Sequence, residues 1–122
     1  MVMMMRKKQL EAVFYRTSQG KDVVLNWLRS LEPEDRRTIG FDLKDVEFGW
    51  PVGMPLCRSL GNGLWEVRSS LSHGKIARLL FCLHQQKIVV LHGFVKKTQK
   101  TPKSDLDLAL KRKKEIEQWP AK

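Results

Sequence analysis

This chain has few of the features that define several large classes of protein. Its 122 residues include only two cysteines and three histidines. No apolar run approaches the ~20 residues that a transmembrane helix needs. The start of the chain, apolar and then basic, has the wrong order for a secretory signal peptide. We therefore expect one folded domain, residues 1–122, that stays in the cytoplasm and has no membrane partner.

The cysteines and histidines are too scattered to form a metal site. Cys82 lies inside an apolar run, and with Cys57 it is typical of a buried thiol in a reducing compartment. A disulfide between the two is the less favoured alternative. None of His73, His84 and His92 has metal-ligand spacing with a cysteine or a carboxylate pair. A glycine-rich phosphate loop and a nucleophile elbow are also missing. The sequence predicts no metal and no cofactor.

Acidic residues are scarce in the second half of the chain. Residues 61–122 carry 13 basic and 5 acidic side chains, whereas residues 1–60 carry 10 and 8. The net charge of the whole chain is +10. A charge excess confined to one half favours a surface that binds RNA, DNA or an acidic protein. A solvated basic face without a partner is the alternative.

The spacing of the apolar residues predicts an α+β domain. The first half is expected to form a strand (10–15), a helix capped by Thr17 or Ser18 that runs to Leu31, and a helix from Pro33 to Gly49. A connecting loop (49–63) should follow. The second half is expected to form three strands (64–68, 76–83 and 88–95) and a helix from Pro102 or Ser104 to about Trp119. Turns this short imply an antiparallel meander. We expect the helices to cover one face of a small, mainly antiparallel sheet, and the other face to stay partly open.

Arg78 is a charge inside an apolar strand. Alternation places it on one face with Ile76 and Leu80, while the opposite face, including Leu83, is apolar and should meet the helices. A charge in such surroundings needs a partner or access to solvent. One reading is a structural ion pair with Glu66. The other is a guanidinium on the open face that binds phosphate.

A run of lysines follows the last predicted strand. Lys96, Lys97, Lys100 and Lys103 precede the next acidic residue, Asp105. We call residues 96–103 the lysine turn. A strand that ends in such a turn is suited to hold phosphates, and the first three lysines are the candidate RNA-binding residues. Alternation directs neighbouring lysines to different sides, so part of the turn could be merely solvated.

Two further candidates lie beside this turn. Arg68 ends the strand before that of Arg78 and shares a side with Glu66. His92 is expected to share a side with Val90, Phe94 and Lys96. A histidine titrates near neutrality and can move protons, although a structural role is commoner for a lone strand histidine.

Three segments of the chain resemble one known family. LWEVRSS (64–70), KIARLLFCL (75–83) and KIVVLHGFVKKTQKTP (87–102) are similar to the HigB-like, phage-derived branch of the RelE/ParE toxin superfamily. The resemblance implies a RelE-like fold of order β-α-α-β-β-β-α and the toxin of a type II toxin–antitoxin pair. It further implies an endoribonuclease that cleaves mRNA in the ribosome without a metal. The implied partners are a helix-turn-helix antitoxin, the ribosome and its mRNA, and operator DNA only through the antitoxin.

The same resemblance implies roles for four basic residues. Arg68, Arg78, Lys96 and Lys97 would hold the RNA and offset charge while the ribose 2′-OH attacks the adjacent phosphate. Several RelE-like nucleases use a tyrosine near the C-terminal helix, but the only tyrosine here is Tyr15. The general acid and base therefore stay open between His92, a lysine, and catalysis through positioning and charge alone. A ParE-like inhibitor of DNA gyrase and a non-catalytic nucleic-acid-binding regulator are the alternative functions.

Overall fold

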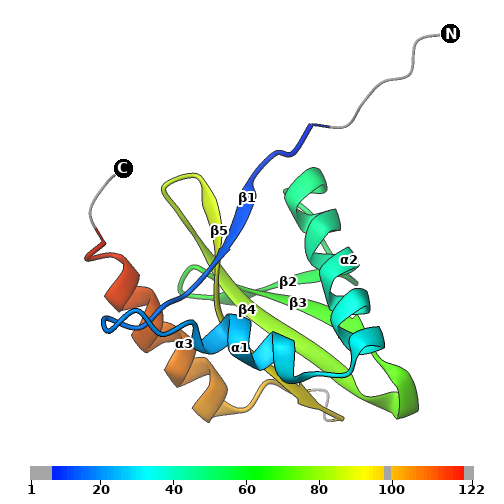
Figure 1. Ribbon diagram of the computed structural model, residues 1–122. Helices are drawn as coiled ribbons and strands as arrows, with labels where there is room; N and C mark the ends of the chain where they lie inside the picture. Colours follow the sequence, from blue (N-terminus) through cyan, green and yellow to red (C-terminus); the bar gives the residue numbers. More distant parts are fainter. Residues whose placement is uncertain (1–6, 98–99, 120–122) are drawn as a thin grey trace, which may run out of the picture.

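A five-stranded sheet and three helices make up the computed structural model, which describes residues 7–97 and 100–119 (Figure 1). The elements in order are β1 (Glu11–Phe14), α1 (Val23–Ser30), α2 (Pro33–Gly49), β2 (Cys57–Gly61), β3 (Leu64–Ser70), the 3-10 turn η1 (Ser72–Gly74), β4 (Ile76–His84), β5 (Lys87–Lys96) and α3 (Lys103–Ile116). The described elements confirm the predicted α+β class, compatible with a RelE-like fold.

The strands lie in the order β1-β5-β4-β3-β2. All neighbours are antiparallel except β1, which runs parallel to β5. The prediction of a loop over residues 49–63 is wrong in part, because β2 lies within it. This strand is short, begins two residues after Pro55 and ends at Gly61, so its local sequence is typical of a loop. Pairing with β3, with Cys57 opposite Val67, is what makes it a strand.

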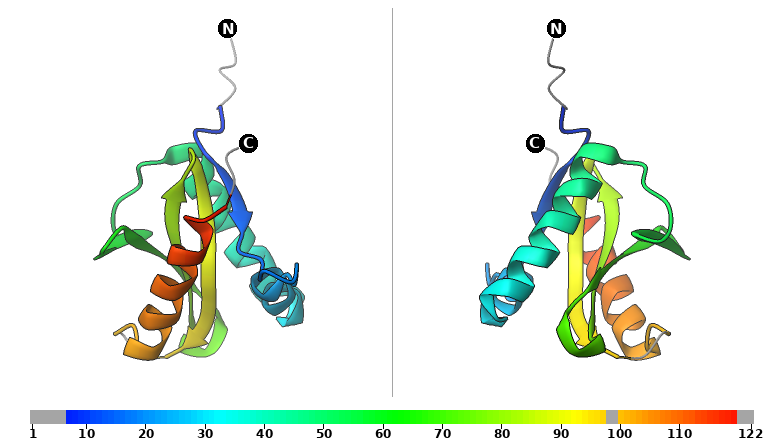
Figure 2. Two further views of the ribbon diagram at one scale, coloured as in Figure 1. Left: turned by 90° about the vertical axis from the view of Figure 1, so that its left-hand side faces the viewer. Right: turned by 90° about the vertical axis from the view of Figure 1, so that its right-hand side faces the viewer.

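Two consecutive residues of β5 show which helices lie on which face of the sheet. A Cβ atom added to Gly93 would lie 2.3 Å from the ring of Trp27 on α1. The side chain of His92 points the other way and contacts Asp105 of α3. Figure 2 shows the same arrangement, with α1 and α2 on one side of the sheet and α3 on the other. The face that we expected to be partly open therefore carries α3.

The prediction that Thr17 or Ser18 caps the first helix is wrong. The Thr17 hydroxyl instead accepts a hydrogen bond from the Lys21 amide at 3.0 Å, which closes a turn before the helix. The helix begins only at Val23, after Asp22. The second helix begins at Pro33, as predicted, because proline suits the first helical position.

The hydrophobic core fills both sides of the central strands. Leu79 and Phe81 are buried on the α1 and α2 side, and Ile116 of α3 is buried on the other. Leu83, which we expected to meet the helices, is 43% exposed because it lies near the end of β4. The thiols of Cys57 and Cys82 are free and buried, and burial raises the pKa of each to about 11. In the part of the chain that is described, no helix has the length and apolar character of a membrane span.

Candidate functional site

The strand register gathers basic side chains on the sheet face that carries α3. Residues paired across neighbouring strands project to the same side. One row across the sheet contains Arg58, Glu66, Leu80 and His92; the next contains Arg68, Arg78 and Phe94; Lys96 pairs with Ile76 in a third. We call this surface, with the lysine turn beside it, the basic face. The sheet therefore brings together four of the predicted site residues, namely Arg68, Arg78, His92 and Lys96.

Glu66 is the carboxylate at the centre of the arginines. Its side chain is fully buried. The Nε atom of Arg68 donates to Oε1 at 2.8 Å, and Nη2 of Arg58 lies 3.6 Å from the same oxygen. The Nε atom of Arg78 lies 3.9 Å from Oε2. One buried negative charge thus compensates three guanidinium groups, two of which reach the surface.

The expectation that Arg78 lies on an open part of the sheet is wrong. Its side chain is 0% exposed, and its guanidinium forms an ion pair with Glu66 and lies over the ring of Phe94. Burial and the neighbouring charge of Arg68 lower the pKa of Arg78. The structural ion pair, which was the other reading of this residue, is what the geometry shows. Arg68, at 23% exposed, is the arginine of this row that reaches solvent.

The second half of the basic face centres on His92. Its Nε2 atom lies 2.6 Å from Oδ1 of Asp105, and Nζ of Lys96 lies 3.4 Å from Oδ2 of the same carboxylate. The side chains of His92 and Asp105 are 16% and 13% exposed, so the pair is partly shielded yet open to solvent. A carboxylate that binds one ring nitrogen fixes the tautomer of the histidine, which is the arrangement of a proton-transfer pair.

Sequence reasoning missed the role of Asp105. This residue lies in the first turn of α3, where a carboxylate favours the helix dipole, so the sequence pattern suggested only a helix-start residue. Nothing local signals its contact with a histidine on β5. The contact forms because α3 packs against β5 on the face that carries His92.

Phe94 forms the apolar support between the two halves of the basic face. Its ring stacks on that of His92 at a centroid distance of 5.6 Å. The Nζ atom of Lys96 lies 5.6 Å from the ring centroid, and Cζ of Arg78 lies 5.8 Å from it. Cations near an aromatic face are favourable contacts, and the ring limits how far each charge can move.

The remaining lysines of the turn extend the basic face outward. Lys97 and Lys100 are exposed. Lys103 begins α3 and pairs with Asp107 at 3.3 Å, as expected for residues one helical turn apart. Thr101 anchors the junction between turn and helix, because it is buried and its hydroxyl donates a hydrogen bond to Glu66.

Tyr15 lies away from the basic face. Its hydroxyl donates to Glu115, and the guanidinium of Arg112 lies 4.8 Å from its ring centroid. These partners follow Asp105 by roughly 10–15 Å along the axis of α3. Burial and the Glu115 carboxylate raise the pKa of Tyr15. The only tyrosine of the chain therefore ties the end of β1 to α3.

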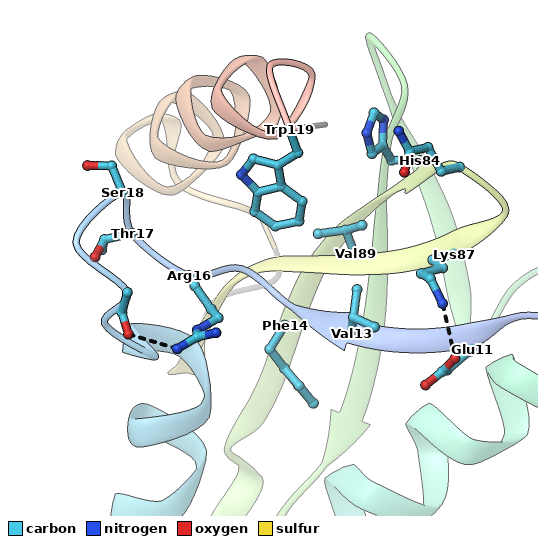
Figure 3. A pocket seen from close by; sticks show the side chains of 12 residues that line it. Glu11, Val13, Phe14, Arg16, Thr17, Ser18, His84, Lys87, Val89 and Trp119 are labelled. Carbon is cyan, nitrogen blue, oxygen red and sulfur yellow. Dashed lines mark hydrogen bonds and ion pairs between the residues drawn. The ribbon is translucent and has the colours of Figure 1, made fainter. Parts of the chain in front are cut away.

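A separate hollow of about 540 Å³ lies at the other end of α3 (Figure 3). Val13, Val89 and Trp119 form its apolar lining, and the ion pair between Glu11 and Lys87, 3.1 Å apart, lies at its rim. None of the predicted site residues lines it. In the described residues, no three His, Cys, Asp or Glu side chains gather as a metal ion would require.

The comparison with protein families covers most of this architecture. A family model described as "Phage derived protein Gp49-like (DUF891)" matches residues 26–114. The matched region runs from within α1 into α3 and includes the whole basic face. No curated protein matches the chain. The chain belongs to the Gp49-like family of phage-derived proteins, which is part of the RelE/HigB-like toxin group.

Proposed function

We propose that this protein is the toxin of a type II toxin–antitoxin pair and acts as a metal-independent endoribonuclease on mRNA bound to the ribosome. Membership of a toxin family supports the first part. The observation that carries the second is the hydrogen bond between His92 and Asp105, on the same sheet face as Arg68 and Lys96. A protein that acted by binding alone would need the cations but not a proton-transfer pair.

The chemistry requires a base for the ribose 2′-OH and cations for the phosphate that it attacks. Asp105 binds Nε2 of His92, so with the proton on Nε2 the other ring nitrogen, Nδ1, is an acceptor. The proposal assigns the removal of the 2′-OH proton to Nδ1. The new O–P bond forms as the P–O5′ bond breaks, and the leaving 5′-oxygen takes a proton from water, which gives a 2′,3′-cyclic phosphate and a 5′-hydroxyl end.

The basic side chains divide into those assigned to the reacting phosphate and those assigned to the other phosphates of the RNA. Arg68 and Lys96, on either side of the buried Arg78, are assigned to the reacting phosphate. Loss of one donor that stabilises the transition state typically costs 10²–10³ in rate. Lys97 and Lys100 are assigned to neighbouring phosphates. Arg78 acts indirectly, through Glu66 and Phe94, because its guanidinium is buried.

The partners follow from the same proposal. A toxin of this group implies an antitoxin, and we propose a helix-turn-helix protein that also carries the operator-binding surface. Ribosome and mRNA are the targets, which places the protein in the cytoplasm. No step of the proposed chemistry needs a cofactor.

The test uses two histidine variants that differ only in position. His92→Gln removes the proposed base, whereas His84→Gln changes a histidine at the end of β4, which lines the hollow beside Trp119 and lies away from the basic face. Induction of the wild-type protein without its antitoxin should stop growth and produce new mRNA 5′ ends, and so should His84→Gln. His92→Gln should do neither. Normal growth with soluble wild-type protein would exclude the toxin, and inhibition of gyrase supercoiling without mRNA cuts would favour the gyrase alternative.

A further inference from the structure

One of the two fully buried charges on the basic face, beside Arg78, is an acid. Glu66 is 0% exposed on β3, between Arg58 of β2 and Leu80 of β4. Burying a carboxylate is unfavourable before pairing, and a protein with a well-packed apolar residue in place of a buried ion pair is often as stable or more so. Stability alone therefore does not account for an acid at this position.

The two oxygens of Glu66 hold different parts of the basic face. Oε1 accepts a hydrogen bond from Nε of Arg68 at 2.8 Å, and Nη2 of Arg58 lies 3.6 Å from the same oxygen. A contact through Nε fixes the plane of a guanidinium and therefore the direction of its terminal nitrogens. The Oε1 side of Glu66 thus orients the arginine that we assign to the reacting phosphate.

Oε2 holds the end of the lysine turn. It accepts the hydrogen bond from the buried hydroxyl of Thr101, next to Pro102 at the start of α3. Three residues after Pro102 comes Asp105, which binds His92 and Lys96. A displacement at Thr101 would therefore reach the His92 pair through one turn of helix.

From these contacts we infer that Glu66 is the positioning residue of the RNA site, because its two oxygens hold Arg68 and Thr101, the residue before Pro102 and α3, in one arrangement. This inference rests on the proposed function for the identity of the ligand. Glu66 touches no substrate in this account and acts through Arg68 and Thr101.

The experiment removes one contact of Glu66 without removing its charge. Thr101→Val deletes the hydroxyl and keeps the shape of the side chain, whereas Thr101→Ser keeps the hydroxyl. Thr17→Val is the control, since the Thr17 hydroxyl also takes part in a hydrogen bond, accepting from the Lys21 amide, but lies in the turn before α1. Glu66→Gln is the direct variant, which leaves three guanidiniums without their counter-charge and is therefore at risk of not folding.

Two measurements separate positioning from stability. The first is the affinity for a short single-stranded 2′-O-methyl RNA, which cannot be cleaved. The second is the Nε–Hε resonance of Arg68 in full-length protein. We expect Thr101→Val to weaken RNA affinity about tenfold, as loss of a buried charge-assisted hydrogen bond allows, and to shift the Arg68 resonance. Thr101→Ser and Thr17→Val should match the wild type in both.

Each outcome bears on a separate claim. RNA binding and an Arg68 resonance unchanged in Thr101→Val, at lower thermal stability, would make Glu66 structural only and overturn the inference. Failure of the wild type to bind RNA would also overturn it. Wild-type protein that binds RNA but cleaves none in the ribosome would refute the proposed nuclease and leave the positioning role of Glu66 supported.

Discussion

The Nε2 atom of His92 lies 2.6 Å from Oδ1 of Asp105, joining β5 to the first turn of α3 across the lysine turn. The contact has two consequences. It fixes the tautomer of the only histidine on the basic face of the described residues, and it holds Lys96 through the other carboxylate oxygen at 3.4 Å. Both consequences can be tested by changing the carboxylate alone.

Asp105→Asn should lower the rate of RNA cleavage by at least about a hundredfold, because an amide no longer fixes the proton of His92 on Nε2. The fold should persist, since the substitution keeps the size of the side chain. Single-turnover cleavage with the enzyme in excess measures the effect. Asp107→Asn is the control, because Asp107 is an exposed carboxylate on the same helix. Equal rates for the two variants would exclude a role for Asp105.

Gly93→Ala should destabilise the protein by about 1–3 kcal/mol, the usual range for an overpacked core. The added Cβ would lie 2.3 Å from the ring of Trp27, so α1 must shift on β5. Chemical denaturation measures the loss. Gly40→Ala on α2 meets no atom within 4 Å and should be neutral or stabilising, since alanine favours a helix. A stable Gly93→Ala protein would mean that Trp27 does not pack there.

Arg78→Ala should lower the free energy of unfolding by about 3–5 kcal/mol, because it breaks a buried pair and leaves the Glu66 carboxylate with less compensation. Thermal unfolding followed by circular dichroism measures the loss, with exposed Arg36→Ala on α2 as the control. A fully stable but inactive Arg78→Ala protein would instead indicate that Arg78 contacts the reacting phosphate.

The lysine turn should set the salt dependence of RNA binding. Each lysine that meets a phosphate of single-stranded RNA contributes roughly 0.7 to the slope of log affinity against log salt. Removing Lys97 and Lys100 together should flatten the slope accordingly. The charge-matched control removes Arg36 and Arg37, which are exposed on α2. If the slope changes equally in both double variants, the lysines form only a solvated face and do not contact RNA phosphates.

Alkaline pH should destabilise the fold through its buried thiols. Cys57 and Cys82 titrate at about 11 in the folded chain, against a reference value of 9.0. Between these values the unfolded chain loses protons that the folded chain keeps. Stability is therefore fully present below about pH 9 and falls as the pH rises toward 11. Replacing both cysteines with alanine should flatten this part of the stability curve, measured by urea unfolding; an unchanged slope would assign the loss to other groups.

Local patterns predicted most elements, and tertiary contacts decided the rest. Alternation in β4 placed Arg78 correctly on the side of Leu80, but its buried contacts are with Glu66 of β3 and Phe94 of β5. The prediction that His92 and Val90 share a side is wrong, because a bulge at Leu91 shifts the pairing so that Val90 lies opposite Phe81 and His92 opposite Leu80.

The resemblance of the lysine turn to a toxin family located the basic face, yet it could not supply the two carboxylates that organise it. Glu66 and Asp105 contact residues on other elements, and such contacts leave no local periodic signal in the sequence. The assignment of Arg68, His92 and the lysines to RNA chemistry remains a prediction.

The most direct test is the chemistry of the cut ends. Purified wild-type protein is first stripped of bound metal by EDTA and gel filtration, then incubated with programmed ribosomes in Mg²⁺ buffer, and the mRNA fragments are analysed for their termini. Cleavage through the 2′-OH predicts 2′,3′-cyclic phosphate and 5′-hydroxyl ends from the wild type and no cuts from His92→Gln. Intact mRNA with active ribosomes, fragment ends of another chemistry, or equal cleavage by His92→Gln would contradict the account.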